Sequence, residues 1–218
     1  MIVLDAATKS LEFVLAAAVT TNQLPFVASY RDVTKIPYIE APDDRIEKWK
    51  HRLPPRKKLR VGVAWAGNPQ FKADRGRSIG LARFAPLLSQ PGLQFVSLHR
   101  EVRAEHIGVL QSLPQLIHFG EELEVFADTA AVISQLDLVI SSDTSVVHLA
   151  GAMGVPVWIL LKSSADWRWM LDSENSPWYP TAKLYRQAKL GDWESVIERV
   201  REDLLRWAET RIDAPTVP

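Results

Sequence analysis

The chain has 218 residues, which suits one substantial domain with an appendage, and its 47% hydrophobic and 24% charged residues indicate a sizeable core. Its 26 basic and 26 acidic residues give a formal net charge of zero, which argues against a nucleic-acid-binding protein that depends on a basic surface. It contains no cysteine, so disulfides, thiolate metal sites and cysteine nucleophiles are excluded.

The first 58 residues are weakly patterned, and the prolines and basic cluster of residues 51–60 (HRLPPRKKLR) separate them from the rest. Residues 10–21 are compatible with a helix, residues 43–53 predict one, and the proline-containing stretch between them predicts extended or irregular chain. The apolar run at 11–19 is too short to span a bilayer, and no signal-peptide pattern precedes it. We therefore expect a cytoplasmic protein without a membrane span.

From residue 59 onward, apolar runs of strand length alternate with segments of helical periodicity. The predicted strands are apolar at nearly every position, which is typical of strands buried on both faces of a sheet. This alternation predicts an α/β, Rossmann-like domain over 59–210, with a doubly wound parallel sheet of about six strands, and a flexible tail over 211–218. Strands are expected at 59–67, 93–100, 116–120, 137–142, 155–161 and 182–187, and helices at 79–90, 102–113, 124–136, 144–154 and 192–210.

Ligands of open parallel sheets bind beyond the carboxyl ends of the strands, which directs attention to the loops that follow them. The loop after the first predicted strand begins with a turn at Asn68 and contains three cations, Lys72, Arg75 and Arg77. Three cations at this edge of the sheet favour an anion site. A basic loop that is merely solvated is the alternative reading.

The loop after the fourth predicted strand (SSDTS) runs directly into a helix. Asp143 or Thr144 is expected as the N-cap, its side-chain oxygen accepting from an N–H of the first turn. The small residues that follow, beginning with Ser145, leave other N–H groups open to an anion, which the helix dipole favours. His148 lies one turn after Thr144 on nearly the same face, where it can contact a phosphate or be a buried, hydrogen-bonded structural histidine.

Other functional classes fail on motif grounds. The chain has no G-x-G-x-x-G fingerprint for NAD and no P-loop. Asp143, Ser145 and His148 share one helical turn, where they cannot form a serine-histidine-acid relay, and no G-x-S-x-G elbow is present. There is no D-x-D motif for a divalent metal, so no metal site is expected. Phosphate charge would then be met by Lys, Arg, His and backbone amides.

A loop at 165–180 (ADWRWMLDSENSPWYP) holds three of the eight tryptophans, after the fifth predicted strand. Core packing and a lid over the site are the two interpretations, and large aromatic side chains usually pack. Arg168, between Trp167 and Trp169, is placed either to reach a ligand or to stack on a ring.

Three segments together resemble a known family. VGVAWAGNPQFKADRGRSIGLARFAPLL, FADTAAVISQLDLVISSDTSVVHLAGAMGVPVWILL and ADWRWMLDSENSPWYP resemble the carboxy-terminal, donor-binding domain of GT-B glycosyltransferases. The greatest likeness is to bacterial tetratricopeptide-associated transferases, which are related to heptosyltransferases and more distantly to O-linked N-acetylglucosamine transferases. The likeness covers residues 58–208, and its D-T-[SG]-x-x-H-L-A element is fairly specific.

The resemblance implies a binding site for a nucleoside-diphosphate sugar, the donor substrate, with no further cofactor. The helix from Thr144 would hold the diphosphate through backbone amides and the Thr144 and Ser145 hydroxyls, with His148 nearby. Lys72 would neutralise the leaving nucleoside diphosphate, the task a metal performs in other glycosyltransferases. Residues 120–122 would lie near the base and ribose. The expected binding residues are Asn68, Lys72, Arg77, Asp143, Thr144, Ser145 and His148.

The chain departs from the family in length. A GT-B enzyme has two Rossmann-like domains, and the amino-terminal one supplies the acceptor surface and usually the general base. Residues 1–58 are too few for such a domain at about 25–30 residues per βα unit. They are expected to be an appendage, or a remnant of the acceptor domain with its linker. In the family, the helix at 193–209 would cross back onto the second domain.

The sequence thus predicts a metal-independent glycosyltransferase-type domain, inverting if active, whose acceptor is a protein or a saccharide and whose catalytic residues are unassigned. The alternative is a non-catalytic or degenerate module that binds nucleotides or proteins, and an unrelated nucleotide-binding α/β protein is a third reading. A homodimer, or a partner that supplies the missing domain, is an expected form of assembly.

Overall fold

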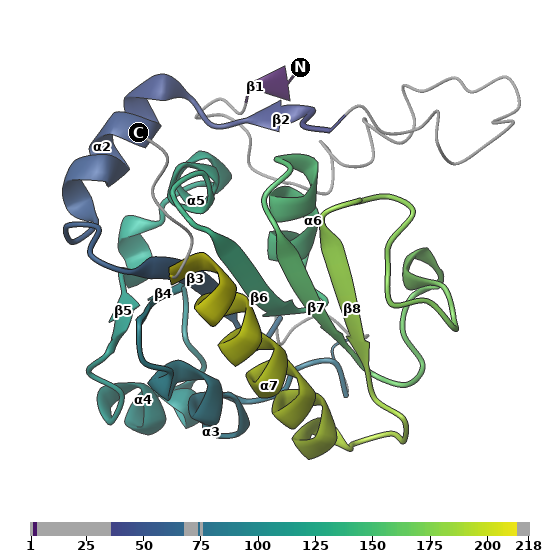
Figure 1. Ribbon diagram of the computed structural model, residues 1–218. Coiled ribbons are helices and arrows are strands. Elements are labelled where there is room, and N and C mark those ends of the chain that lie inside the picture. The colour runs from purple at the N-terminus through teal and green to yellow at the C-terminus, as the bar shows by residue number, and fades with distance from the viewer. Residues whose placement is uncertain (1, 4–35, 68–73, 75, 213–218) are drawn as a thin grey trace, which may run out of the picture.

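The computed structural model describes residues 2–3, 36–67, 74 and 76–212 (Figure 1). Its main feature is a six-stranded sheet in the order β5-β4-β3-β6-β7-β8, in which every neighbouring pair is parallel. The strands are β3 (Leu59–Ala64), β4 (Leu93–Ser97), β5 (Leu116–His118), β6 (Leu138–Ser142), β7 (Val157–Leu161) and β8 (Ala182–Arg186). The predicted doubly wound, Rossmann-like α/β fold is confirmed.

Helices connect the strands, and a second, two-stranded parallel sheet joins β1 (Ile2–Val3) to β2 (Ile39–Glu40). The α-helices are α2 (Asp43–Arg52), α3 (Leu81–Phe84), α4 (Ala104–Gln111), α5 (Phe126–Ile133), α6 (Ser145–Ala152) and α7 (Trp193–Ile212). The 3-10 segments are η3 (Ala85–Ser89), η4 (Gly120–Glu122) and η5 (Trp167–Trp169). The helix considered at 10–21 and residues 213–218 of the predicted tail lie outside the described residues.

Two predicted elements differ in their bounds for identifiable reasons. The strand expected at 59–67 ends at Ala64, because the next amide, that of Trp65, donates to the His99 side chain. The helix expected at 79–90 is one α-helical segment followed by a 3-10 segment that contains Pro86. Proline has no N–H and its ring clashes with the carbonyl four residues earlier, so a regular α-helix does not continue through it.

Consecutive residues of each central strand belong to opposite cores. In β6, Val139 packs in the core beneath α2, α5 and α6, and Ile140 packs in the core beneath α3, α4 and α7. Successive side chains of a strand point to opposite faces of the sheet, so a strand covered on both faces must be apolar throughout. This arrangement explains the unbroken apolar runs in the sequence.

The long helix α7 crosses the front of the sheet in Figure 1 and packs on it. Its buried residues Val196, Val200 and Leu204 belong to the same core as the front faces of the central strands. In the family that the sequence resembles, this helix would cross back onto a second domain, and in this chain it packs on the sheet of its own domain. The helix covers apolar surface of its own sheet instead, which would otherwise be exposed to water.

Residues before the sheet share its core. Ile39 and Trp49 are fully buried within the core that α5 and α6 cover. The buried carboxylate of Asp128, at the start of α5, accepts hydrogen bonds from the Trp49 indole at 2.8 Å, from Arg45 at 3.0 Å and from Lys48 at 3.3 Å. A buried carboxylate needs such partners, so α2 is fixed to α5 by charge as well as packing. The division at residue 58 stays a prediction.

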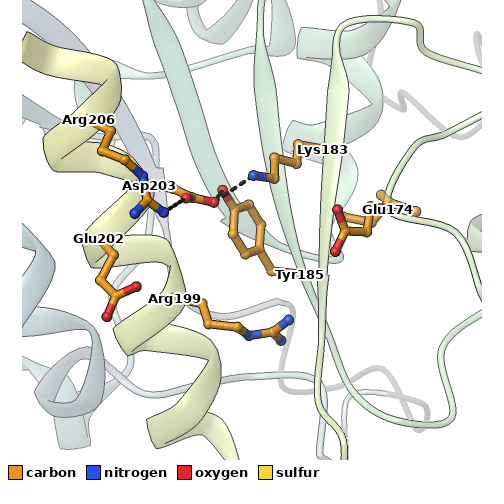
Figure 2. A pocket seen from close by; sticks show the side chains of 8 residues that line it. Glu174, Lys183, Tyr185, Arg199, Glu202, Asp203 and Arg206 are labelled. Atoms are coloured by element: carbon orange, nitrogen blue, oxygen red, sulfur yellow. Dashed lines mark hydrogen bonds and ion pairs between the residues drawn. The ribbon is translucent and has the colours of Figure 1, made fainter. Parts of the chain in front are cut away.

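A second ionic cluster ties α7 to the edge strand β8 (Figure 2). The Asp203 carboxylate accepts from the Lys183 ammonium at 2.6 Å, from the Tyr185 hydroxyl at 2.7 Å, and from the Arg206 guanidinium. These side chains line a pocket of about 250 Å³ that also includes Glu174, Leu184, Arg199 and Glu202. Three acids face three bases there, so the pocket attracts neither anions nor cations on balance.

The Asp203 cluster makes a prediction about acid stability. Burial raises the pKa of Asp203, but the three hydrogen bonds outweigh it and lower the pKa from the ordinary 3.8 to about 2. A depressed pKa stabilises the fold above pH ~4 and loses that effect as the pH falls towards about 2, a difference of roughly 2 kcal/mol. Asp203→Asn should therefore lower the free energy of unfolding by about 2 kcal/mol at pH 7 and by much less at pH 2.5.

Urea unfolding at the two pH values measures this difference. Glu209→Gln, a change at an exposed position of the same helix, is the control and should have little effect at either pH. An Asp203→Asn effect of equal size at pH 7 and pH 2.5 would contradict the ionic account.

Candidate functional site

The strand order places the candidate site between β3 and β6. From these two neighbouring strands the chain continues in opposite directions, from β3 to β4 and from β6 to β7. Ala64 is paired with Ser141, so the loops after both strands start at the same level. In open α/β sheets, ligands bind in the crevice that such a reversal creates, and this crevice is the candidate site.

Polar contacts join the described residues of the loop after β3. The Gly67 amide donates to the Ser78 hydroxyl at 3.1 Å, and that hydroxyl lies 2.8 Å from each oxygen of the Asp74 carboxylate. Arg103, from the loop after β4, donates to the Gly67 carbonyl at 2.7 Å and to Asp74 at 2.5 Å. A Cβ at Gly67 would lie 2.4 Å from the Arg77 guanidinium, so glycine permits this closeness.

Asp74 therefore holds two arginines at the crevice. Arg77 donates to it from 3.3 Å, in addition to Arg103. Burial raises the pKa of Asp74, but the bonds from Arg103 and Ser78 and the two nearby positive charges lower it overall. The carboxylate stays ionised at neutral pH between the two arginines, and Arg103 also lies 3.9 Å from the Glu105 carboxylate. Asn68, Lys72 and Arg75, which were predicted in this loop, lie outside the described residues.

Helix α6 begins at the crevice as predicted, but it is capped differently. Thr144 is the N-cap, with an extended backbone at φ −136° and ψ 174°. Its side chain accepts no hydrogen bond from the first turn and lies 3.2 Å from the Ser141 hydroxyl instead, so the predicted side-chain cap is wrong. The Val147 amide donates to the Thr144 carbonyl at 3.2 Å, whereas without a side-chain cap the earlier amides of the turn, including the one at Ser145, can bind an anion.

Asp143 lies at the point where β6 ends. Burial raises its pKa, opposed by the indole N–H of Trp169 and then by the positive charge of Arg77. Trp169 Nε1 is buried and has no hydrogen bond of good geometry, so its effect on Asp143 is that of a nearby dipole. The charge of Arg77, in the loop after β3, thus acts on the residue that follows β6.

His148 is held by aromatic neighbours. Its Nδ1 lies 3.1 Å from the Tyr179 hydroxyl, and its ring stacks on Trp169 with centroids 5.2 Å apart and an interplanar angle of 22°. Burial, and then the charge of Arg168, lower the pKa of His148 to about 4. The imidazole is therefore neutral at pH 7, and it adds a hydrogen-bonding group but no positive charge. These contacts are those of the hydrogen-bonded structural histidine.

Core packing and a lid were the two interpretations of the tryptophan loop, and the loop contains both a buried and an exposed tryptophan. Trp169 is fully buried and packs, whereas Trp167 is exposed. The Arg168 guanidinium lies over the Trp167 ring, 4.7 Å from its centroid, so the stacking alternative for this arginine is the one observed.

Residues 120–122, expected near a base and ribose, form η4 after β5. Gly120 has a positive φ of 57°, a conformation that favours glycine. The Glu122 carboxylate receives two hydrogen bonds from Arg52, each 2.7 Å long, from outside the sheet. The segment lies at the same edge as the crevice, and its acid is already paired.

Sequence reasoning missed the histidines around Trp65. The Trp65 amide donates to His99 Nε2 at 3.0 Å, and the Trp65 indole donates to His106 Nδ1 at 3.1 Å. Burial and neighbouring charges lower the pKa of His99 to about 3, so this ring is neutral and carries its proton on Nδ1. Asp74 and Arg103 were also missed, because only the fold brings together residues so far apart in the chain.

Within 2–3, 36–67, 74 and 76–212, no group of three or more His, Asp and Glu side chains could hold a metal ion. No helix in these same ranges is long and apolar enough to cross a membrane.

The sequence resembles part of a larger protein. No protein-family model matches the chain. Protein FlbA of Caulobacter vibrioides is 30% identical over 183 residues, which make up 78% of this chain and 29% of FlbA. The chain therefore spans less than a third of the length of this relative.

Two solved glycosyltransferases resemble the structure. The ADP-heptose LPS heptosyltransferase II of E. coli has a TM-score of 0.58 and 15% identity, over 79% of this chain and 53% of that protein. A glycosyltransferase family 9 protein of Veillonella parvula has the same score and identity, over 95% of this chain and 61% of its own. The domain thus has a fold found in GT-B glycosyltransferases, of which it spans roughly half to three fifths.

The contact between α6 and Tyr179 yields a prediction. A Cβ at Gly151 would lie 2.4 Å from the Tyr179 ring, so Gly151→Ala must displace the ring that holds His148. Overpacking of this kind costs about 1–3 kcal/mol, more than the ~1 kcal/mol by which alanine favours a helix. We expect lower stability and a His148 pKa that rises from about 4 towards the ordinary 6.5.

Thermal unfolding and NMR titration of the histidine ring measure the two effects. Gly108→Ala in α4 is the matched control, because no atom lies within 4 Å of its added Cβ, and it should stabilise the helix. If Gly151→Ala is as stable as Gly108→Ala, the proposed packing of Tyr179 on α6 is wrong.

Proposed function

We propose that this chain binds a nucleoside-diphosphate sugar in the crevice between β3 and β6, with the diphosphate at the first turn of α6. The observation that carries the proposal is the first turn without a side-chain cap, facing a loop that holds Arg77. Backbone N–H groups at a helix start and a nearby cation together suit a bound phosphate.

Each residue of the proposed site has a separate task. The amides of the first turn and the hydroxyls of Thr144 and Ser145 donate to the phosphates, while Arg77 supplies positive charge. His148 is neutral at pH 7 and held at Nδ1 by Tyr179, so it would contact a phosphate through its other ring nitrogen. Asp143, whose pKa burial raises, organises the turn.

The loop after β3 would complete the site. Asp74 orients Arg77, while Arg103 offsets the charge of the Asp74 carboxylate. By the resemblance, Lys72 would contact the phosphates and Asn68 would lie in the same loop. Fixed donors of this kind stabilise the charge that develops on a leaving nucleoside diphosphate, so no metal is required.

Glycosyl transfer, inverting if it occurs, is the activity this proposal favours. Its support is the fold shared with two glycosyltransferases, one of them the ADP-heptose LPS heptosyltransferase II of E. coli. The acceptor is a protein or a saccharide, and we expect the reaction to be cytoplasmic.

The second candidate is a nucleotide-binding module without catalysis, because the chain spans only 53% and 61% of those two transferases. A homodimer or another partner would then supply an acceptor surface.

Calorimetric titration with UDP, GDP, ADP and their sugar conjugates, in the presence of EDTA, tests the donor site. We expect at least one of them to bind with a dissociation constant in the micromolar to low millimolar range, about −8 to −4 kcal/mol. If none binds, the donor-site proposal fails. Transfer or slow hydrolysis of the bound sugar nucleotide by the purified chain would favour the enzyme over the module.

Substitutions at the cations test how the diphosphate is held. Arg77→Gln and Lys72→Ala should each weaken binding of the tightest-binding nucleoside diphosphate at least about ten-fold and leave binding of the matching nucleoside almost unchanged, because a hydrogen bond to a charged group contributes about 1.5–3 kcal/mol. Arg201→Gln, on the exposed side of α7 and paired with Glu198, is the control. Equal loss for diphosphate and nucleoside would refute a role in phosphate binding.

A further inference from the structure

Exposed apolar side chains occur in loops at the edge of the sheet where the crevice lies. Among the described residues, the exposed large hydrophobic side chains are Ile107, Trp167, Met170, Leu171 and Leu190. All but Ile107 lie in the loops that follow β7 and β8. Single exposed hydrophobic residues are ordinary, whereas a group of them beside a candidate site points to a ligand or partner surface.

Trp167 is the largest of these side chains, and its ring is held in place. Arg168 covers one face at 4.7 Å, and Trp178 meets the ring at 6.0 Å and an interplanar angle of 88°. The Trp178 indole donates to the Arg168 carbonyl at 3.0 Å, which fixes this pair to the turn. Trp167 is nevertheless 65% exposed, so most of the indole still faces solvent.

The backbone beneath the ring is strained and anchored. Met170, directly after η5, has φ 55° and ψ −177°, a conformation that is otherwise almost confined to glycine. The Arg186 guanidinium donates to the Trp169 carbonyl at 2.8 Å and to the Met170 carbonyl at 2.6 Å. This turn directs Trp169 inward onto His148 while Trp167 faces outward. Strained turns persist where the surroundings hold them, and they concentrate at ligand sites.

Polar groups border the exposed ring. The Asp166 carboxylate accepts from the Arg168 amide at 3.0 Å and from its guanidinium at 2.8 Å, so the pair carries no net charge. The charges of Asp166 and Arg168 also reach Asp143 and His148 in the crevice, where they shift the pKa values of both groups. Trp169, two residues after Trp167, stacks on His148 with ring centroids 5.2 Å apart, so the exposed ring lies at the rim of the proposed donor site.

We propose that Trp167, with Asp166 and Arg168, is a binding platform for the acceptor and that the acceptor group it takes is an uncharged pyranose ring. The C–H groups on one face of such a ring carry partial positive charge and pack on the negative face of an indole. Its hydroxyls can donate to the carboxylate and accept from the guanidinium. A net-neutral pair does not select a phosphate, and a rigid platform loses little entropy on binding.

The assignment of this saccharide as the acceptor rests on the proposed donor site, but binding at Trp167 does not. NMR of the full chain tests binding directly, because each of the eight tryptophans has one indole N–H signal. We would titrate maltose, lactose and chitobiose to about 100 mM, a range suited to the millimolar affinities of small ligands. The signal that Trp167→Ala removes should shift with at least one disaccharide. The Trp207 indole, which also lies under an arginine, should not shift.

Trp167→Ala should weaken the binding of that disaccharide at least ten-fold and leave nucleotide affinity unchanged. The proposal is overturned if no disaccharide moves the Trp167 signal, or if the signal responds only to nucleotides. A signal that responds only to protein concentration would mark a contact between two copies of the chain and would also overturn it. If the Trp167 signal shifts with a saccharide but no nucleotide binds, the donor-site proposal alone is refuted. If a nucleotide binds but no saccharide shifts the Trp167 signal, the platform proposal alone is refuted.

Discussion

The parallel pairing of β3 with β6 is the constraint on which the rest of the structure depends. It places the first and fourth strands of the sheet side by side, from which the chain then turns to opposite edges. The loops at their carboxyl ends consequently face each other across a crevice that no crossover fills. Everything we assign to the site follows from this pairing: the uncapped first turn of α6, the loop after β3, and the tryptophan turn beyond β7.

The charge states of the crevice residues depend on burial and on their hydrogen-bond partners. Asp74 stays ionised because Arg103, Ser78 and Arg77 surround it, whereas burial keeps His99 and His148 neutral. The positive charge of the described residues near α6 therefore comes from arginine, which holds its charge at any physiological pH. Such a site would bind an anion with little dependence on pH near neutrality, in contrast to a site built on charged histidines.

The sequence was sufficient for the fold because strands buried on both faces must be apolar throughout, as Val139 and Ile140 of β6 show. It also placed the start of α6 at Thr144. It could not give the Asp74–Arg103 contact, whose partners are 29 residues apart and share no local pattern. The missing side-chain cap of α6 depends on the orientation of the Thr144 hydroxyl towards Ser141. The packing of α7 depends on which apolar surface of the sheet the other helices leave uncovered. The cations Lys72 and Arg75 remain sequence predictions.

The central claim is that the first turn of α6 binds a diphosphate without a metal. Backbone amide shifts of the isotopically labelled chain, recorded with EDTA while the tightest-binding nucleoside diphosphate is added, test it most directly. The account predicts that the amides of Ser145 and Val146 move together and saturate with one binding constant, while those of α2 stay in place. Saturating binding that leaves the amides of Ser145 and Val146 unmoved would contradict it.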